Sequence, residues 1–343
     1  MKAVIFSDVG KFEVIEKPVP KIKNDNEVLV HVEAASICGS DVGALADPPA
    51  YVFDKGVVLG HEFVGKVVEA GSNVKKLAVG DRVACMPNIA CGHCDMCELG
   101  YPNLCRNLQS IGGDLDGGFA EYVVLPESAT AKVPADMPTD LAVFSEPVKC
   151  VMGGLSKFNI VPGETVLLIG CGTIGACLLS LLKAKGAGKV IVSEKSDYRG
   201  EFARKLGADV IINPDKDDME TIIMETTDGK GVDISVEATG TAMLECIEYT
   251  RPAGKVLLMG MNATASQPIC QQHVAHKDLT LYGSYIGKFI AETTVKLLDS
   301  GLVDFTKLIT QRYDLADFGK GLEDMRAGEA IEVILYTGAE VVK

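Results

Sequence analysis

The chain contains 343 residues, of which 47% are hydrophobic, and carries a formal net charge of -14 at pH 7. This length suits two domains, and the apolar content is sufficient to form a core in each. The acidic balance argues against nucleic acid and anionic membranes as partners, because both bind basic surfaces, and it favours a small-molecule partner. No apolar run approaches the roughly 18 residues of a membrane-spanning helix. Residues 1–10 lack the regions of a signal peptide, so we expect a cytoplasmic protein.

The first 150 residues predict a mainly β domain. They contain short strand-like runs, such as 27–32 and 65–69, which Gly, Pro and Asp interrupt. The whole chain has 11 cysteines. In a reducing cytosol we expect free thiols and metal ligands rather than disulfides. The spacing of the cysteines in this domain therefore indicates where metals bind.

A thiol, an imidazole and a carboxylate occur together in the segment 37–65. Cys38 begins the motif Cys-Gly-Ser-Asp, and His61 and Glu62 follow in the motif Gly-His-Glu. One soft and two harder donors of this kind can bind zinc, and a catalytic zinc site keeps one position open for water or substrate. The alternative for this segment alone is a buried thiol beside a core histidine. The motifs that follow favour the metal site.

A second cluster consists of four cysteines with the spacing C-x2-C-x2-C-x7-C, namely Cys91, Cys94, Cys97 and Cys105. Four thiolates complete a tetrahedral zinc site without an open position, so this site would be structural. An iron–sulfur cluster is the alternative. The bacterial ferredoxin motif, however, has a shorter last spacing and a Pro after its final Cys, where this chain has Arg106. His93, inside the loop, is a second candidate for one ligand position.

The second domain begins near Pro162 with a dinucleotide-binding pattern. Residues 165–169 form a short apolar run typical of a buried parallel strand, and Gly-Cys-Gly-Thr-Ile-Gly follows at 170–175. A helix-like segment then ends near Gly186. Strand, glycine-rich turn and helix in this order indicate a site where a pyrophosphate approaches a helix N-terminus.

Glu194 follows the next predicted strand, 189–192, at the offset from the glycines where an acidic residue binds the adenosine ribose. The same carboxylate repels a 2′-phosphate, so we expect NAD as the cofactor. NADP is the less favoured alternative, because Lys195 and Arg199 follow closely. An ordinary solvated acid is the other interpretation of Glu194, and its offset disfavours that interpretation.

Strands and helices alternate through the rest of the second domain. The pattern predicts strands at 209–212, 232–237, 255–260 and 279–283, with helices around 219–225 and 242–249. Strict alternation predicts a doubly wound parallel sheet with right-handed crossovers. The chain then returns to the first domain and ends in a strand-like run at 332–335. We therefore predict a first domain of residues 1–150 completed by 288–343, and a nucleotide-binding domain of residues 151–287.

Over essentially its whole length, the chain resembles the zinc-containing medium-chain dehydrogenases of the alcohol dehydrogenase superfamily. The similar features are the motifs at 38–41 and 60–62, the four-cysteine loop, Gly-Gly-Phe-Ala-Glu-Tyr at 117–122, the glycine turn and Glu194. The resemblance implies an α/β plus β fold, with a GroES-like, mainly β catalytic domain and a Rossmann domain. The chain is most similar to the sorbitol (polyol) and threonine dehydrogenases, because Ser-Glu-Pro at 145–147 stands where liver-type enzymes have a cysteine ligand.

The resemblance also implies particular site residues. Cys38 and His61 would hold a catalytic zinc, with Glu62 and Glu146 as direct or water-mediated ligands and Cys150 as a competing third ligand. With the four-cysteine site, this makes two zinc ions per chain. The implied cofactor contacts are Gly170, Gly172, Thr173, Ile174, Gly175, Glu194, Arg199, Met259, Met261, Ser284 and Tyr285.

The implied reaction transfers a hydride between a secondary alcohol, such as a polyol, sugar alcohol or amino alcohol, and NAD, giving the ketone. Ser40 would accept the hydroxyl proton, with a simple turn hydroxyl as the alternative. Polyol and threonine dehydrogenases often carry a His five residues after the zinc cysteine, where this chain has Gly43. This departure weakens the assignment to sorbitol or threonine. Tyr51 and Phe53 are expected to line the substrate pocket or to pack in the core.

Three other functions are alternatives to this one. The first is an NADP-dependent alcohol or aldehyde reductase of the same superfamily. The second is a zinc-free reductase of enones or quinones, which the metal-ligand motifs disfavour. The third is a non-catalytic NAD-binding scaffold, which the complete ligand set disfavours. Relatives in this branch are commonly tetramers, so we expect a homo-oligomer, with a tetramer favoured over a dimer.

Overall fold

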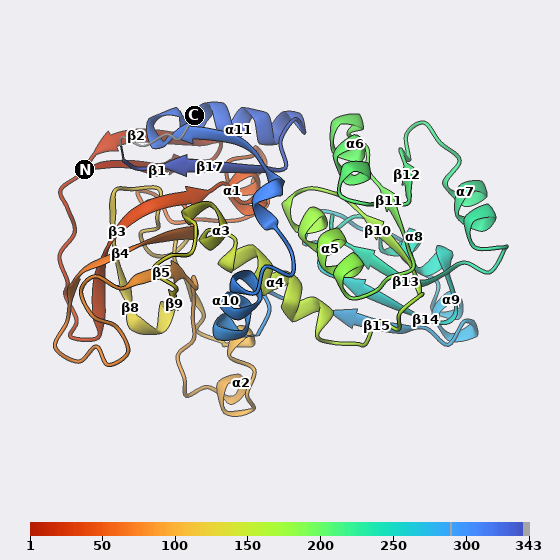
Figure 1. Cartoon of the computed structure of the whole chain (residues 1–343), viewed down its shortest axis with the longest axis horizontal. Helices are drawn as coiled ribbons and strands as arrows, with labels where there is room; N and C mark the ends of the chain where they lie inside the picture. Colours follow the sequence, from red (N-terminus) through yellow and green to blue (C-terminus); the bar gives the residue numbers. More distant parts are fainter. Residues whose placement is uncertain (289, 339–343) are drawn as a thin grey trace. The chain divides into compact units, whose positions relative to one another are not determined.

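The computed structural model describes residues 1–288 and 290–338, and the chain folds into two compact units (Figure 1). Unit 1 is Met1–Lys149 with Lys288–Lys343, and unit 2 is Cys150–Gly287. Cys150 thus belongs to unit 2, one residue from the boundary expected from the sequence. Phe289 and residues 339–343, which fall in the predicted first domain, lie outside the described residues. No helix in the described ranges combines the length and apolar character needed to cross a membrane.

Unit 1 is built around a seven-stranded sheet in the order β16-β17-β3-β4-β5-β9, with β8 paired to β3. These strands are β3 (Glu27–Ser36), β4 (Glu62–Ala70), β5 (Arg82–Cys85), β8 (Tyr122–Pro126), β9 (Thr130–Val133), β16 (Ile309–Asp314) and β17 (Glu332–Tyr336). Strand β17 runs antiparallel to β3, with Ile334 opposite Ser36, so the end of the chain completes the first unit.

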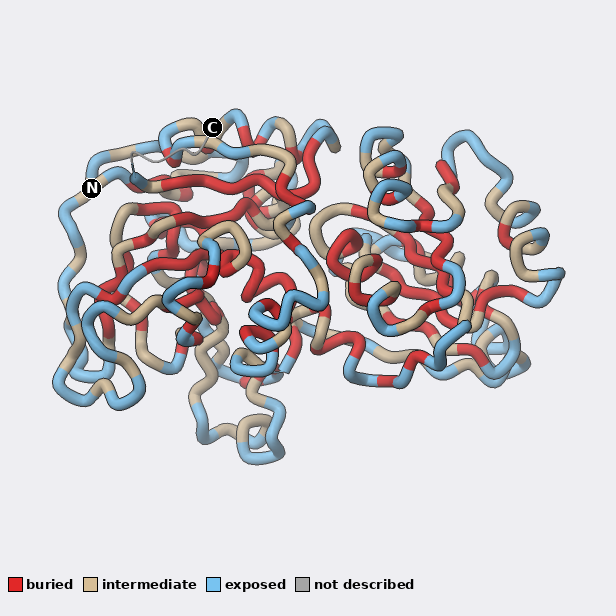
Figure 2. Tube along the Cα trace, in the orientation of Figure 1, coloured by how far each residue is buried: buried red, intermediate tan, exposed pale blue. Residues whose placement is uncertain are grey.

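Short elements surround this sheet. They are the strands β1 (Lys2–Asp8), β2 (Lys11–Glu16), β6 (Asn88–Ile89) and β7 (Gln109–Ser110), the α-helices α1 (Gly39–Ala44), α2 (Asp95–Glu98), α3 (Thr139–Ala142), α10 (Ala291–Asp299) and α11 (Phe318–Ala327), and the 3-10 helices η1 (Pro102–Leu104), η2 (Glu127–Ala129), η3 (Phe305–Leu308) and η4 (Leu315–Asp317). The core lies between the sheet and α11, where the rings of Phe119 and Phe318 pack with centroids 5.2 Å apart. Figure 2 shows the buried residues concentrated along the strands.

Unit 2 contains a six-stranded parallel sheet in the order β12-β11-β10-β13-β14-β15. The strands are β10 (Thr165–Ile169), β11 (Lys189–Ser193), β12 (Val210–Ile212), β13 (Val232–Glu237), β14 (Thr250–Leu258) and β15 (Thr280–Gly283), and the helices are α5 (Thr173–Ala184), α6 (Asp197–Lys205), α7 (Met219–Thr226), α8 (Met243–Tyr249) and α9 (Gln271–His276). This order places the topological switch between β10 and β13, the usual location of a bound dinucleotide. Helix α4 (Ser145–Leu155) begins in unit 1 and ends in unit 2.

Strand β14 begins five residues earlier than the sequence pattern predicts. The added residues include Pro252 and Gly254, and the strand continues through an irregularity in its pairing with β13, between Val232 and Ile234. Ala253 takes a left-handed φ of 57° there. The irregularity accommodates residues that a regular strand does not favour.

Gly175 at the start of α5 allows a close backbone approach, because a Cβ at this position would lie 2.1 Å from the carbonyl oxygen of Gly170. We expect Gly175→Ala to destabilise unit 2 by about 1–3 kcal/mol, since overpacking forces the backbone apart. A Cβ at the exposed Gly283 would meet none of the described atoms within 4 Å, so Gly283→Ala is the matched control. Thermal unfolding measures both variants, and equal melting temperatures would contradict the prediction.

Candidate active site and nucleotide site

Unit 1 brings together three of the side chains predicted to bind a catalytic metal. Cys38 immediately precedes α1, His61 immediately precedes β4, and Glu62 is the first residue of β4. One donor atom from each of the three residues lies within 4.8 Å of the other two. A thiol, an imidazole and a carboxylate at these separations fit a divalent cation such as zinc, whose bonds to such donors are about 2.0–2.3 Å long. We call these residues the three-donor group.

The pairing of β3 with β4 places the three-donor group. Ser36 at the end of β3 lies opposite Glu62, and Cys38 follows two residues later. The Ser36 hydroxyl donates a hydrogen bond to Oε2 of Glu62 at 2.5 Å. Gly60 takes a φ of 89°, which turns the chain immediately before His61. The register of two strands and one glycine thus determine where the donors meet.

Asp41 lies behind the three-donor group, completely buried in the first turn of α1. Its Oδ2 accepts a hydrogen bond from the backbone N–H of Cys38 at 3.0 Å, and its Oδ1 is 3.9 Å from Nδ1 of His61. Burial acts to lower the pKa of His61, but the carboxylates of Asp41, Glu62 and Glu146 outweigh it and raise the pKa. A carboxylate facing Nδ1 leaves Nε2 as the ring nitrogen available to a metal. The role of Asp41 was not predicted from the sequence. Its position three residues after Cys38, in the first turn of a helix, was the available signal for a carboxylate that bonds to the backbone of Cys38.

A further buried carboxylate, Glu332 at the start of β17, also acts on the site. Burial raises the pKa of Glu62 well above its usual range, and the charge of Glu332 raises it further. Burial and the charges of Glu62 and Asp41 likewise raise the pKa of the Cys38 thiol. A divalent cation reverses this effect, because it stabilises the deprotonated thiol and carboxylates. The concentration of acids is therefore a second observation that fits a bound metal.

Glu146 acts electrostatically on His61 and Glu62, and its carboxylate bonds to Lys149. Its Oε1 accepts a hydrogen bond from Nζ of Lys149 at 2.9 Å, and both side chains are almost completely buried. Within the described part of the chain, Glu146 and Cys150 are both outside the set of mutually close donor atoms. The Cys150 thiol donates instead to the carbonyl oxygen of Ile286 at 3.5 Å.

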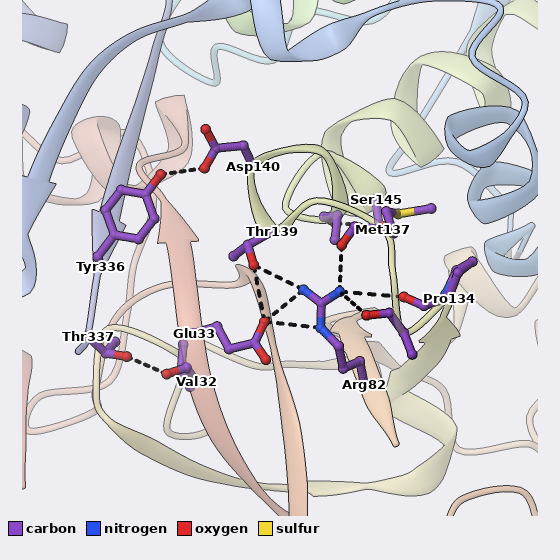
Figure 3. Close-up of polar contacts among 12 residues, drawn as sticks. Val32, Glu33, Arg82, Pro134, Met137, Thr139, Asp140, Ser145, Tyr336 and Thr337 are labelled. Carbon is purple, nitrogen blue, oxygen red and sulfur yellow. Dashed lines mark hydrogen bonds and ion pairs between the residues drawn. The ribbon is translucent and has the colours of Figure 1, made fainter. Parts of the chain in front are cut away.

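An ion-pair network fixes the segment that leads to α4 (Figure 3). The guanidinium group of Arg82 donates to Oε2 of Glu33 at 2.7 Å, to the carbonyl oxygen of Met137 at 2.5 Å and to Oγ1 of Thr139 at 3.1 Å. These bonds join β3 and β5 to the start of α3. A partly buried arginine with several partners holds a loop rigidly, because each N–H of its planar group has a fixed direction.

Three other hydrogen bonds lie beside this network. Asp140 in α3 accepts one from the Tyr336 hydroxyl (Figure 3) and another from Nη2 of Arg312 at 2.7 Å. The Ser145 hydroxyl then donates to the carbonyl oxygen of Ala142 at 2.7 Å, at the start of α4. The sheet thus supports the helix that carries Glu146 and Lys149.

Ser40 contacts the three-donor group, whereas Tyr51 lies beside Gly43 and Phe53 packs in the core. Oγ of Ser40 lies 3.4 Å from Nε2 of His61. A Cβ at Gly43 would lie 3.0 Å from two ring carbons of Tyr51, so this ring occupies the space beside the glycine. Phe53 contacts Phe6 edge-to-face with ring centroids 6.3 Å apart and packs against the core of unit 1.

The four cysteines of the loop also meet, with their sulfur atoms within 4.8 Å of one another. Backbone N–H groups of Cys91 and Asn107 donate to the sulfur of Cys105 at 3.2 and 3.3 Å. Hydrogen bonding, first of all to the backbone, lowers the pKa of Cys91 to about 6, which favours the thiolate. His93 is exposed, and its Nδ1 donates to the carbonyl oxygen of Cys91 at 2.8 Å. Four converging sulfurs fit a closed, tetrahedral zinc site.

In unit 2 the predicted cofactor residues surround the glycine turn. Glu194 follows β11, and its carboxylate accepts hydrogen bonds from the backbone N–H of Cys171 at 2.7 Å and of Ser196 at 2.9 Å. The guanidinium of Arg199 approaches the turn from α6, since a Cβ at Gly172 would lie 3.8 Å from its Nη1. The turn itself consists of Gly170, Gly172, Thr173, Ile174 and Gly175, with α5 beginning at Thr173.

The other predicted cofactor residues follow the carboxyl ends of β14 and β15. Met261 and Tyr285 are exposed, and the N–H of Ser284 donates to the carbonyl oxygen of Leu258 at 2.9 Å. Met259 lies against Gly154. Carboxyl ends of parallel strands meet at the edge of the sheet where dinucleotides bind.

Glu237 is a further residue at this edge that the sequence analysis missed. It is the last residue of β13 and is buried. Its Oε1 accepts a hydrogen bond from the backbone N–H of Thr239 at 2.9 Å. The N–H of Gly240 donates to both carboxylate oxygens, at 2.9 Å to Oε1 and 2.8 Å to Oε2. The carboxylate thereby fixes the turn after β13, next to the topological switch. An acid at the carboxyl end of a predicted parallel strand was the available signal.

Comparison with known proteins identifies the family. The model of the alcohol dehydrogenase GroES-like domain matches residues 24–135, and the model of the zinc-binding dehydrogenase domain matches residues 173–300. An L-threonine 3-dehydrogenase from Caldanaerobacter subterraneus subsp. tengcongensis is 36% identical over 338 residues, covering 94% of this chain and 95% of the relative.

Solved structures agree. Alcohol dehydrogenase TADH from Thermus sp. ATN1 superposes with a TM-score of 0.90 at 30% identity, covering 98% of this chain and 99% of the other. A protein from Sinorhizobium meliloti described as a zinc-binding dehydrogenase, in a structure bound to NADP, gives 0.91 at 31% identity with the same coverage. The chain therefore belongs to the zinc-type medium-chain dehydrogenase/reductase family, and it is an oxidoreductase of that type. The fold class expected from the sequence is confirmed.

The four-cysteine group predicts a metal that is separate from the one at the three-donor group. We expect Cys105→Ser to lose one of two zinc ions per chain, because a hydroxyl replaces one of four thiolate ligands. The exposed Cys270 provides the control, and Cys270→Ser should keep both ions. Elemental analysis of the purified variants measures the stoichiometry. Two ions retained in Cys105→Ser would show that this cysteine is no ligand.

Proposed function

We propose that the protein transfers a hydride between a secondary alcohol and NAD, giving the ketone, with zinc at the three-donor group. The observation that carries this proposal is the convergence of a thiol, an imidazole and a carboxylate in unit 1, with the buried Asp41 behind the imidazole. The three-donor group belongs to unit 1 and the glycine turn to unit 2, so the reaction requires both units.

Cys38, His61 and Glu62 would hold the catalytic zinc, and the four-cysteine loop a structural one. When bound, the catalytic zinc acts as a Lewis acid that lowers the pKa of a substrate hydroxyl. Asp41 orients His61 so that Nε2 faces the metal position. Ser40 lies 3.4 Å from that nitrogen and is placed to accept the hydroxyl proton of the substrate.

Glu194 supports NAD as the cofactor. Two backbone N–H groups hold its carboxylate beside the glycine turn, where it can accept hydrogen bonds from ribose hydroxyls and would repel a 2′-phosphate. A second candidate is the same reaction with NADP. The guanidinium of Arg199 near Gly172 favours it, as does the relative from Sinorhizobium meliloti with bound NADP.

The proposed substrates are amino alcohols and polyols. A relative named L-threonine 3-dehydrogenase shares 36% identity with almost the whole chain, which favours an alcohol that bears an amino group. Gly43 and the Tyr51 ring give this chain its own surface beside Ser40, and pocket shape determines the choice among alcohols. The homo-tetramer stays a prediction.

Initial rates of NAD reduction on a panel of amino alcohols, polyols and simple alcohols test the proposed reaction. We expect activity with at least one secondary alcohol, and Cys38→Ser should lower it by about 1,000-fold or more, because the metal loses its thiolate ligand. Cys270→Ser is the control that keeps full activity. Undiminished activity in Cys38→Ser would refute the role of the three-donor group.

Glu194→Ala tests the choice of cofactor. We expect the affinity for NADH to fall about 10-fold, equivalent to about 1.4 kcal/mol, because the ribose hydroxyls lose a hydrogen-bond acceptor. The preference should move toward NADPH, because its 2′-phosphate is no longer repelled by the carboxylate. The chain contains no tryptophan, so cofactor fluorescence can be titrated without that background. Glu201→Gln on the exposed face of α6 is the control. Unchanged affinities for both cofactors would show that Glu194 does not bind the ribose.

A further inference from the structure

We propose that Glu237 is a positioning residue of the nucleotide site, which acts through Thr239 to hold the glycine turn after β10 in the shape that receives the cofactor pyrophosphate. Only 2% of Glu237 is exposed, so it acts from beneath residues 238–241, which we call the β13 turn. The inference rests on the proposed function, since a dinucleotide must bind at 170–175. It adds a residue outside that segment on which cofactor affinity depends.

The carboxylate of Glu237 holds the β13 turn together. Backbone N–H groups of Thr239, Gly240 and Thr241 donate to it at 2.8–3.3 Å, and the Thr239 hydroxyl also donates to its Oε1. Gly240 takes a left-handed φ of 79°, a conformation that lets successive N–H groups point at one acceptor. Hydrogen bonds to a charged oxygen are stronger than those to a neutral one. The shape of the β13 turn therefore depends on this charge.

Thr239 connects the β13 turn to the glycine turn. A Cβ at Gly170 would lie 2.5 Å from Cγ2 of Thr239, so this methyl group occupies the space beside the first glycine. The N–H of Ala238 donates to the carbonyl oxygen of Ile169 at 3.0 Å, immediately before that glycine. The hydroxyl and the methyl of Thr239 share one carbon, so the hydrogen bond to Glu237 also fixes the direction of the methyl. Glu237 thus determines what Gly170 packs against.

The segment after β14 supports the β13 turn from its other side. Backbone N–H groups of Met259 and Gly260 donate to the carbonyl oxygen of Glu237 at 2.9 and 3.0 Å. A Cβ at Gly260 would overlap the backbone nitrogens of Thr239 and Gly240, so the two segments are in direct contact. Close-packed segments transmit a displacement to their neighbours. A change in the β13 turn therefore reaches the glycine turn.

Fluorescence titration of the full chain with NADH, well below the melting temperature, tests the inference. Glu237→Gln keeps the size of the side chain but replaces one acceptor oxygen by a donor, so the N–H groups of the β13 turn lose a partner. We expect the affinity for NADH to fall about 10-fold, because the glycine turn is no longer held in its binding shape. Thr239→Ser keeps the hydroxyl and removes the methyl, and should lower the affinity about 3-fold for the same reason. ADP-ribose, which carries the pyrophosphate, should lose affinity by the same factors in competition with NADH.

Two further variants make the test specific. Ser235 is fully buried in the same strand, and its hydroxyl shares a hydrogen bond of 2.6 Å with that of Thr250. Ser235→Ala is therefore the matched control, which should lower the melting temperature and keep the affinity for NADH. The double variant of Glu237→Gln and Thr239→Ser should bind NADH as Glu237→Gln alone does, because changes along one chain of contacts are not additive.

Three results would overturn the inference. The first is wild-type affinity for NADH in Glu237→Gln or Thr239→Ser together with a lowered melting temperature, since this would make the role merely structural. The second is a loss of affinity for NADH without a loss for ADP-ribose, and the third is full additivity in the double variant. If Glu237→Gln does not fold, Thr239→Ser decides alone, and wild-type affinity in that variant overturns the inference.

The proposed function can fail separately in the same experiment. If the wild-type chain binds neither NADH nor NADPH, both the proposed function and the inference are wrong. If it binds NADPH and not NADH, the choice of NAD is wrong, and the same variants titrated with NADPH decide on the inference. NADH binding that ignores Glu237 and Thr239 contradicts the inference alone.

Discussion

The antiparallel pairing of β3 with β4 is the constraint on which the candidate active site depends. It sets Ser36 opposite Glu62. Cys38 comes two residues after Ser36 and His61 directly before Glu62, and their donor atoms lie within 4.8 Å of each other. Because side chains alternate between the two faces of a strand, a shift of the register by one residue would send these donors to opposite faces. The strand pairing that stabilises the mainly β unit therefore also determines the geometry of the metal site.

Electrostatics makes the same site dependent on a cation. Burial raises the pKa values of Cys38, Asp41 and Glu62, and Glu332 adds its charge to the region. Groups that resist ionisation without a metal become good ligands with one, since the ion stabilises their charged forms. Glu146 differs from these groups, because Lys149 balances its charge without a metal.

The linear motifs were predictable because their residues are close in the sequence. The glycine turn at 170–175, Glu194 and the four-cysteine loop each form from one short segment, and the structure brings the members of each together. Glu332 was not predictable in this way, because it follows Glu62 by 270 positions and reaches the site only through the pairing of β17 with β3. The ion pair between Glu146 and Lys149 was not predictable either. It forms because both residues lie in α4, and the Ser-Glu-Pro motif alone does not show that a helix continues through them.

We expect one chain to bind two metals of different character. Anomalous X-ray scattering at the zinc edge, on crystals of the protein purified without chelators, distinguishes the two sites. We expect two peaks per chain, one among the sulfurs of the four-cysteine loop and one between Cys38, His61 and Glu62. A single peak in the loop, with the three-donor group ordered and empty at saturating zinc, would contradict this expectation.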